Sequence, residues 1–231
     1  MSNNKITIAI DGFSSTGKST LAKQLAKQLG YVFVDTGAMY RAITFFAMKN
    51  GFINSDKFDV KSLVNELPKI MLQFKFNEQL GFAEMFLNKD NVESEIRKIE
   101  VSGHVSQVAA VSEVRAKLVE QQQEMGKNKG IVMDGRDIGT VVFVDAELKI
   151  FMTASPEVRA KRRFDELTAA GQIVSFDEVY KNVTERDFLD STRKDSPLLK
   201  ADDAIEIDNS DISRDEQFQI VLDLANDLIN Q

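Results

Sequence analysis

One eight-residue segment near the N-terminus restricts the fold more than any other feature of the chain. Residues 12–19 read Gly-Phe-Ser-Ser-Thr-Gly-Lys-Ser and match the phosphate-loop pattern G-x-x-x-x-G-K-[ST] at every fixed position. Residues 5–10 are an apolar run that indicates a strand before the loop, and leucines and alanines at helical spacing follow the loop as far as Gly30. A second apolar run at residues 31–34 completes a βαβ unit, which requires a parallel sheet with a right-handed crossover.

The same segment predicts a nucleoside triphosphate as a ligand. Its glycines let backbone N–H groups turn toward phosphate oxygens, and the helix that follows directs its positive end at the same oxygens. Lys18 supplies a positive charge for the β- and γ-phosphates, and the Ser19 hydroxyl is a candidate ligand for Mg²⁺. The predicted nucleotide-binding residues are Gly12, Phe13, Ser14, Ser15, Thr16, Gly17, Lys18, Ser19 and Thr20.

The rest of the chain extends the alternation of strands and helices, with one interruption. Strands are expected at residues 131–133, 149–152 and 204–207. Helices are expected at residues 36–49, 56–67, 156–171 and 214–229, as a pair within residues 93–126 that meets near Ser112, and between Ser175 and Pro197. The interruption is a hairpin of residues 71–76 and 82–87, which we interpret as an insertion at the edge of the core. We therefore expect one α/β domain, which a length of 231 residues suits.

Composition excludes several classes of function. A net charge of -7 argues against a general nucleic-acid-binding protein, because phosphate-backbone affinity needs a basic surface. The chain has no cysteine, which excludes disulfides and thiolate metal sites, and its single histidine, His104, excludes a multi-histidine site. We interpret His104 as a packed or solvated helix residue. No run approaches about 18 apolar residues and no signal peptide is evident, so we expect a cytoplasmic protein without a membrane partner.

Arginines in three places could neutralise a phosphorylated acceptor. Such an acceptor already carries oxyanions, so its transfer reaction needs charge neutralisation and alignment more than a strong base. Arg41 follows the second predicted strand, and Arg136 lies in the Asp-Gly-Arg-Asp turn of residues 134–137. The third place is a helical region that contains Arg159, Arg162, Arg163, Arg186, Asp190 and Arg193. Arg186, Asp190 and Arg193 have the spacing of one helix face, for which a solvated, salt-bridged surface is the alternative interpretation.

Acidic residues near these arginines leave other readings open. Asp134 ends an apolar strand, where it could hold magnesium through water or could have only a structural role. The acceptor could also be another nucleoside monophosphate, or a hydroxyl substrate such as shikimate. A hydroxyl acceptor would need a carboxylate base, for which Asp35 and Asp137 are candidates. A nucleotide-dependent switch that binds a protein partner is a further alternative, although the sequence lacks the Asn-Lys-x-Asp motif of GTPases.

Five segments, in chain order, resemble bacterial cytidylate kinase. They are the loop of residues 12–19, Asp-Thr-Gly-Ala-Met-Tyr-Arg at 35–41, Ser-Gln-Val-Ala-Ala at 106–110, Asp-Gly-Arg-Asp-Ile-Gly-Thr-Val-Val-Phe at 134–143, and Glu-Arg-Asp at 185–187. The resemblance covers nearly the whole chain. It implies a single P-loop nucleoside-monophosphate kinase domain over residues 1–231, with a five-stranded parallel sheet flanked by helices. It also implies a small antiparallel nucleotide-binding insertion at about 37–105 and a helical lid at about 156–195.

The resemblance implies a reaction and a role for each matching residue. The reaction is transfer of the γ-phosphoryl group of ATP, with Mg²⁺, to CMP and to dCMP, by an enzyme expected to be a monomer. Ser106, Arg115 and Asp137 fall where the family reads cytosine, and Arg186 and Asp190 fall where it contacts the sugar. The acceptor phosphate is expected at Arg41, Arg136 and Arg193, with Thr36 also at a substrate-binding position. The catalytic set is expected to be Lys18, Arg136, Arg159, Arg162 and Arg193, with Arg159 and Arg162 in the lid.

The chain departs from the family pattern at several positions. Thr36 stands where some members have serine, and both residues carry a hydroxyl group. Ser19 stands where some members have glycine, which strengthens the expectation of a direct magnesium ligand. Residues that are more charged in some members are replaced here by Phe188, Leu189, Ser191 and Thr192. These last replacements bear on the chemistry of the expected lid.

Overall fold

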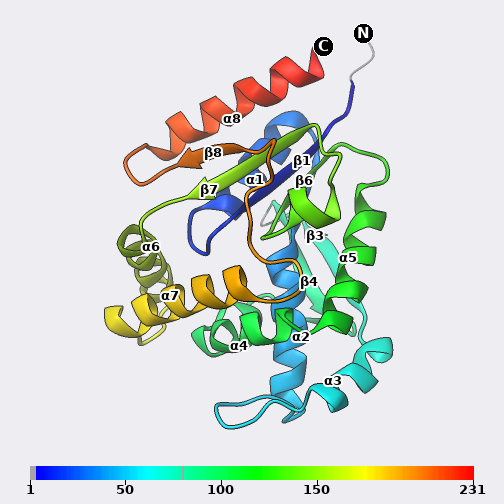
Figure 1. Ribbon diagram of the computed structural model, residues 1–231, viewed down its shortest axis with the longest axis vertical. Helices are drawn as coiled ribbons and strands as arrows, with labels where there is room; N and C mark the ends of the chain where they lie inside the picture. The colour runs from blue at the N-terminus through cyan, green and yellow to red at the C-terminus, as the bar shows by residue number, and fades with distance from the viewer. Residues whose placement is uncertain (1–3, 80) are drawn as a thin grey trace. The chain divides into compact units, whose positions relative to one another are not determined.

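The computed structural model of the protein describes residues 4–79 and 81–231 (Figure 1). The chain forms two compact units. The first unit combines the described part of Met1–Asp35 with Val119–Gln231, and the second unit is Thr36–Leu118. Helix α5, Ser112–Gly126, begins in the second unit and ends in the first. Within the described residues, none of the helices combines the length and the apolar character that a membrane span requires.

A parallel sheet forms the centre of the first unit and confirms the expected five strands. The strands lie in the order β2-β6-β1-β7-β8, and every neighbouring pair is parallel. Their bounds are β1 Thr7–Gly12, β2 Val32–Asp35, β6 Ile131–Asp134, β7 Leu148–Thr153 and β8 Ile205–Asp208. The carboxyl ends of parallel strands meet at one edge of the sheet, so the residues that follow β1 and β6 are neighbours at the edge where ligands bind in such folds.

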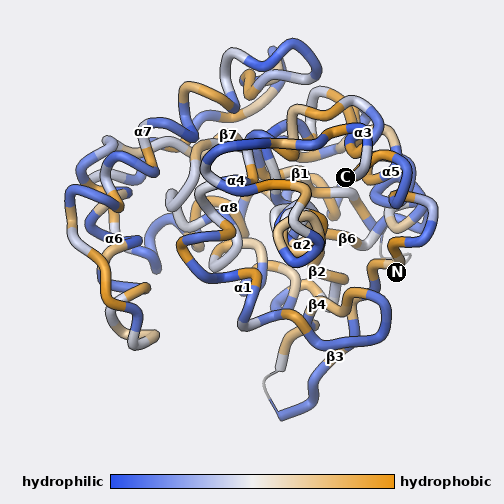
Figure 2. Tube along the Cα trace, turned by 90° about the horizontal axis from the view of Figure 1, so that it is seen from below, coloured by the Kyte–Doolittle hydropathy of each residue, from blue (hydrophilic) through white to orange (hydrophobic). Residues whose placement is uncertain are grey.

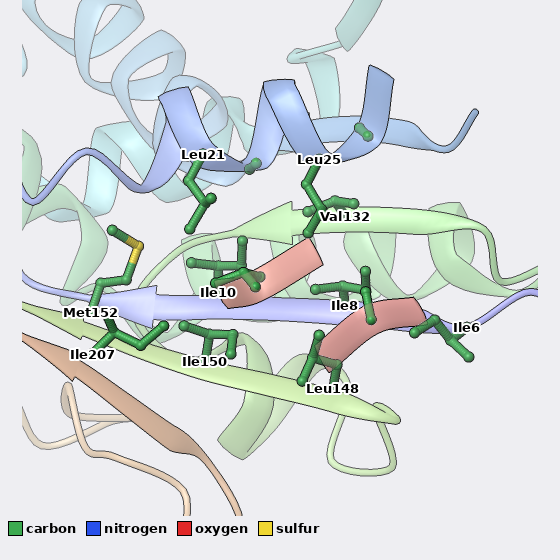
Figure 3. Close-up of a cluster of buried hydrophobic side chains, with 14 residues drawn as sticks. Ile6, Ile8, Ile10, Leu21, Leu25, Val132, Leu148, Ile150, Met152 and Ile207 are labelled. Carbon is green, nitrogen blue, oxygen red and sulfur yellow. The ribbon is translucent and has the colours of Figure 1, made fainter. Parts of the chain in front are cut away.

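One face of this sheet is covered by two helices, α1 (Lys18–Leu29) and α8 (Arg214–Ile229). Figure 3 shows Ile6, Ile8 and Ile10 of the first strand segment in one cluster with Leu21 and Leu25 of α1. Successive side chains of a strand point to opposite faces of the sheet. These isoleucines therefore share one face, and Thr7, Ala9 and Asp11 lie on the other. The hydrophobic pattern thus fixes which way the polar residue at the end of β1 points.

Two further helices of the first unit, α6 (Pro156–Ala169) and α7 (Phe176–Thr192), lie side by side (Figure 1). Each begins at a serine whose hydroxyl accepts from a backbone N–H three residues later, Ser155 from Val158 and Ser175 from Glu178. Figure 2 shows hydrophilic and hydrophobic residues alternating along α6, as expected for a helix with one packed face. A short π-helical turn, η3 (Ile138–Val142), follows β6 after three residues.

The second unit combines helices with a small antiparallel sheet. Its helices are α2 Thr36–Lys49, α3 Val60–Glu66 and α4 Ile99–Ala109, with 3₁₀ turns η1 Leu67–Lys69 and η2 Glu95–Arg97. The sheet has the order β3-β4-β5, with bounds Leu72–Asn77, Phe82–Leu87 and Asp90–Asn91. Helix α2 packs against α4, and the interior contains Met39, Ile43 and Met85, all fully buried. The predicted hairpin is confirmed, but it gains a third short strand.

Several local predictions are wrong. The helix expected at residues 56–67 begins only at Val60, because Asp59 caps it by accepting from the backbone N–H of Ser62. The helix ends at Glu66, one residue earlier than expected, and the 3₁₀ turn η1, which contains Pro68, follows it. Helical structure was not expected in η3. The shared helix face of residues 186, 190 and 193 is also wrong in part, since α7 ends at Thr192 and Arg193 already has an extended backbone (φ −60°, ψ 146°).

Candidate functional site

The phosphate loop joins the end of β1 to the start of α1, and its backbone turns sharply. Gly12, Ser15 and Gly17 have φ values of 139°, 60° and 89°, the left-handed region that favours glycine. At Gly12 the need for glycine is also steric, because a Cβ there would lie 2.0 Å from the carbonyl oxygen of Met152 in the neighbouring strand β7. Left-handed turns of this kind direct successive N–H groups into a concavity that binds anions.

Lys18 is the first residue of α1 and is 5% exposed. Its ammonium group donates to the carbonyl oxygen of Phe13 at 2.5 Å and lies 3.3 Å from the Thr16 hydroxyl. Burial lowers the pKa of Lys18 well below its usual value, and Arg136 lowers it further, while Asp134 and Asp11 oppose the shift. A phosphate in the loop would supply an anionic partner, which favours the charged form of the lysine.

Ser19 and Asp134 come together at the carboxyl edge of the sheet. The Ser19 hydroxyl donates to the Asp134 carboxylate at 2.8 Å, across a sequence separation of 115 residues. Among the residues that the structure describes, no three His, Cys, Asp or Glu side chains form a metal cluster. A hydroxyl and one carboxylate nevertheless fit Mg²⁺, which keeps several waters and is bound mainly through substrate phosphates. Two interpretations of Asp134 were left open, magnesium binding through water and a structural role. They differ only in whether a metal is bound, since the contact of Asp134 with Ser19 exists in either case.

Two ion pairs connect the turn of residues 134–137 to the end of α7. The Arg136 guanidinium donates to Asp190 at 2.9 Å, and Arg193 lies 3.8 Å from Asp137. The side chains of Asp137, Asp190 and Arg193 are at most 7% exposed. Arg193 also donates twice to the carbonyl oxygen of Ser196, at 2.8 and 2.6 Å. The turn and the helix end each contribute one arginine and one aspartate, so two of the three predicted acceptor-phosphate arginines, Arg136 and Arg193, are already paired.

Arg159 is one of the most constrained side chains in the first unit. It is 2% exposed, and its guanidinium forms a bidentate pair with Asp187 of α7 at 2.9 and 2.6 Å. It also donates to the carbonyl oxygen of Ala154 at 2.9 Å, and its guanidinium carbon lies 5.1 Å from the centre of the Phe13 ring in the phosphate loop. Arg159 therefore connects α6, α7 and the loop rather than extending into solvent.

Arg162 is held by the segment that follows β8. It donates to the side-chain oxygen of Asn209 at 2.9 Å and to the backbone oxygen of the same residue at 2.8 Å. The Asn209 amide in turn donates to the carbonyl oxygen of Thr16 at 2.6 Å. Arg186 lies one helical turn before Asp190, close enough to Lys18 to contribute to its lowered pKa. Arg159 and Arg162 of α6 are thus both linked to the phosphate loop, Arg162 through the side chain of Asn209.

Asp11 is an important residue of this region that sequence reasoning missed. Its two carboxylate oxygens accept from the backbone N–H groups of Ile138 and Gly139, at 2.8 and 2.7 Å. Burial raises the pKa of Asp11 to about 6, although these two hydrogen bonds lower it. Sequence reasoning also missed Asn209, and it named Asp187 only as part of the Glu-Arg-Asp segment at 185–187, without a role. The available signals were that segment and the position of Asp11 directly before the motif, since the partners of all three residues are distant in the chain.

The second unit carries the remaining predicted substrate residues. Thr36 is the first residue of α2 and is buried, and Arg41 follows on the same helix and is half-buried. Ser106 lies in the last turn of α4. Arg115 of α5 donates to the carbonyl oxygen of Ala109, the last residue of α4, at 3.2 Å. Its guanidinium carbon also lies 5.6 Å from the ring centre of Tyr40. The structure therefore anchors Arg115 beside the helix end that carries Ser106.

His104, also on α4, has no partner for its Nδ1 atom among the residues that the structure describes, although this atom is buried. The residue is partly buried overall, as expected for a packed helix residue.

Comparison with known proteins identifies the relatives of this chain. A protein-family model described as "Cytidylate kinase" matches residues 8–227. A protein named cytidylate kinase from Flavobacterium psychrophilum is 70% identical over 224 residues, which cover 97% of this chain and 99% of the relative. The cytidylate kinase of Flavobacterium johnsoniae is also 70% identical, with 97% and 98% covered. That of Bacteroides thetaiotaomicron is 55% identical, with 92% and 93% covered.

Proposed function

The chain belongs to the cytidylate kinase family, and from this premise we propose that it transfers the γ-phosphoryl group of ATP to CMP, giving ADP and CDP. The observation that carries the proposal is the near-complete match to cytidylate kinases together with an intact phosphate loop. We propose dCMP as a second acceptor and a monomeric, cytoplasmic enzyme. We also retain the proposal of one kinase domain with an insertion at about 37–105 and a lid at about 156–195.

The phosphate loop would hold the donor nucleotide. Its inward N–H groups and Lys18 neutralise the β- and γ-phosphates, and the start of α1 adds its positive end. When bound, Mg²⁺ would supply positive charge that stabilises the negative charge developing on the transferred group. Ser19 and Asp134 are the residues that would hold the magnesium ion. Phosphoryl transfer needs little covalent chemistry from the protein, so this positioning is the main contribution of the loop.

The acceptor phosphate would bind to arginines that now form ion pairs. We propose that Arg136 and Arg193 exchange part of their contact with Asp190 and Asp137 for the phosphate oxygens of CMP. Arg41 would contribute a further positive charge. Asp190 and Arg186 are then available to the sugar hydroxyls. Planar guanidinium groups suit this role because they can bind phosphate through two parallel hydrogen bonds.

The acceptor base would be selected by hydrogen bonds. Asp137 would accept from the exocyclic amino group of cytosine, while Ser106 and Arg115 donate to its ring nitrogen and carbonyl oxygen. Uracil presents a carbonyl oxygen in place of that amino group and would face the carboxylate with like polarity. A site built for one hydrogen-bonding group can discriminate strongly against a base that lacks it.

The α6 arginines would act at the transferring group from beside the loop. Arg162 lies on α6 and is held by the Asn209 side chain, which itself binds the loop at Thr16. We propose that it closes toward the transferring phosphoryl group when both substrates are bound, which excludes water from the reaction. Arg159 would act with less movement, because its bidentate pair with Asp187 holds it against the phosphate loop.

An acceptor screen tests the proposal. ADP release is measured with ATP and Mg²⁺ against CMP, dCMP, UMP, AMP, GMP and shikimate, one at a time, and again after chelation of the metal. Strong turnover with CMP and dCMP that disappears without Mg²⁺ supports the assignment. Turnover of shikimate would displace it in favour of a hydroxyl acceptor, and ATP hydrolysis without a phosphorylated product would favour a nucleotide-dependent switch.

The Asp137→Ala variant tests the base site within the same assay. Loss of a buried charge-assisted hydrogen bond is worth about 1.5–3 kcal/mol, which predicts a decrease of about 10- to 100-fold in kcat/KM for CMP. The preference for CMP over UMP should fall by a similar factor. Unchanged turnover of CMP in this variant would show that the base is read elsewhere.

A further inference from the structure

We propose that Asp11 is a positioning residue for base recognition: by capping the η3 turn from the neighbouring strand, it leaves the Asp137 carboxylate available to the acceptor base. The inference rests on the proposed function, because base recognition by Asp137 is part of that function. It adds a residue that acts through Asp137 and that does not itself contact the substrate.

The first observation concerns the N-terminus of η3. The first N–H groups of a helical turn lack partners within the turn, and the residue before the turn usually accepts from them with its own side chain. Asp137 occupies this position, with φ −149° and ψ 27°, and aspartate is among the residues preferred there. Nevertheless its side chain makes no capping hydrogen bond. The carboxylate faces Arg193 instead, at 3.8 Å.

The second observation is that Asp11 takes over this capping role. One of its carboxylate oxygens accepts from the N–H group of Ile138 at 2.8 Å, and the other accepts from that of Gly139 at 2.7 Å. These are the first two residues of η3. Because alternation along β1 places Asp11 on the face opposite α1, the carboxylate reaches η3 without meeting the hydrophobic cluster. Asp11 therefore satisfies the N–H group of Gly139, which is one of the groups that the Asp137 side chain would normally cap.

A third observation concerns the space around this contact. A Cβ at Gly139 would lie 3.4 Å from the Asp11 carboxylate and 3.2 Å from the side chain of Lys149. A side chain at this position would therefore crowd the Lys149 side chain and come into van der Waals contact with the Asp11 carboxylate, so a glycine here leaves the most room for the contact. The contact combines a buried acid on one strand with a glycine in the turn, in residues that are distant in the chain.

Asp11 is 5% exposed, and a buried carboxylate carries a desolvation cost that a neutral cap would not. Its pKa is raised to about 6, mainly by this burial. A carboxylate, unlike an amide or a hydroxyl, can accept from both N–H groups with equivalent oxygens. The charged form is therefore the one that fully occupies the turn and takes the capping role in place of Asp137.

The test is a set of variants assayed with CMP, UMP and ATP. In Asp11→Ala the two N–H groups lose their partner and recruit the Asp137 carboxylate, which withdraws it from the base. The KM for CMP should rise about 10-fold or more and the CMP-over-UMP preference should fall by a similar factor. The KM for ATP should change by about twofold or less, because the phosphate loop keeps its own contacts. Thr7→Val, on the same face of β1, is the matched control and should leave both KM values near those of the wild type.

A double variant decides whether Asp11 acts through Asp137. If it does, Asp11→Ala should cause no further loss of CMP-over-UMP preference in an Asp137→Ala background. A further loss there, or an equal rise of the KM values for ATP and CMP in the single variant, would overturn the inference. If Asp11→Ala does not fold, Asp11→Asn, which keeps one acceptor oxygen, should show the same loss of preference in weaker form, and an unchanged preference would count against the proposal.

The same experiment separates this inference from the proposed function. If Asp137→Ala itself leaves the turnover of CMP unchanged, the base site is wrongly assigned and the proposed function needs revision. If Asp137→Ala loses the preference for CMP while Asp11→Ala keeps it, base recognition is sound and only the role of Asp11 is wrong.

Discussion

The phosphate loop and the arginine–aspartate pairs are two parts of one unit that are built in opposite ways. The loop makes some of its contacts within a few residues, as when Lys18 donates to Phe13, and its anion site consists mostly of backbone, although Ser19 and Thr16 also bind the distant Asp134 and Asn209. The pairs join residues far apart in sequence: Arg136 and Asp190 are separated by 54 positions, and Arg159 and Asp187 by 28. A contiguous motif therefore specifies the first site, whereas the second exists only after folding.

The two regions also differ in their charge balance before any substrate binds. Lys18 is buried against neutral oxygens and its pKa is well below normal, so an arriving phosphate adds a partner. Arg136 and Arg193 already face carboxylates, so an arriving phosphate must replace one anion with another. Phosphate binding at the loop therefore adds a favourable ionic interaction. Phosphate binding at the pairs replaces one ionic interaction with another of similar kind.

The largest effect should follow removal of the cation in the loop. Lys18→Ala should lower kcat/KM by about 10³-fold, because no other side chain of the loop supplies positive charge to the transferring group. The measurement is steady-state ADP release with CMP as acceptor. Lys27→Ala, an exposed residue in the last turn of the same helix, is the control and should retain activity. Similar losses in both variants would contradict the assignment.

A smaller effect is expected at the pairs, because a conservative change there keeps the charge. Arg136→Lys should raise the KM for CMP about 10- to 100-fold with little change in the KM for ATP, since an ammonium group cannot reproduce the planar contact with Asp190 and phosphate. Asp190→Asn should raise the KM for CMP less, because it removes the proposed contact with the sugar but no longer competes with phosphate for Arg136. If the two variants change the KM for ATP as much as that for CMP, the pairs do not form a separate acceptor site.

Asp11 connects the two regions, and its titration offers a third measurement. In the folded protein its pKa is raised from 3.8 to about 6, chiefly by burial, with Asp137 adding to the shift and Lys18 opposing it. Because the pKa of Asp11 is higher in the folded than in the unfolded protein, protonation of Asp11 stabilises the folded protein. This stabilisation is complete below about pH 4 and is lost as the pH rises through 6. From pH 4.5 to 7.5, wild type should therefore lose about 2 kcal/mol of unfolding free energy relative to Asp11→Asn.

Urea unfolding at four pH values across this range would measure the difference between wild type and Asp11→Asn. Other carboxylates titrate in both proteins and cancel in the comparison. Parallel pH dependences would show that Asp11 titrates as an ordinary aspartate and that burial does not set its pKa.

The smallest expected effect concerns strain in the loop backbone. Ser15 has a φ of 60°, which costs a residue with a side chain more than it costs glycine. Ser15→Gly should raise the free energy of unfolding by about 0.5 kcal/mol, since the relief of strain exceeds the extra flexibility of glycine in the unfolded chain. The melting temperature should rise by about 1–2 °C. A lower melting temperature would mean that the serine side chain has a stabilising contact of its own.

The same contrast explains what could be predicted from the sequence. The parallel sheet, the loop and the bounds of α8 follow from local periodicity and were predicted correctly. The beginning of α3 depends on the Asp59 cap, and the η3 turn depends on Asp11, more than 120 residues away. Local patterns do not report such distant acceptors. The individual arginines were visible in sequence, but their pairing with Asp187 and Asn209 was not, because each pairing depends on how strands and helices pack.

Gly12 has a consequence for any attempt to alter the donor specificity of this enzyme by random mutagenesis. The carbonyl oxygen of Met152 occupies the place that a Cβ would need, so every substitution at this codon would separate β1 from β7 at the point where the loop begins. A library randomised across residues 12–15 should therefore return glycine at the first position in every active clone, while the next three positions vary. The neighbouring strand, and not the nucleotide, sets that limit on laboratory evolution.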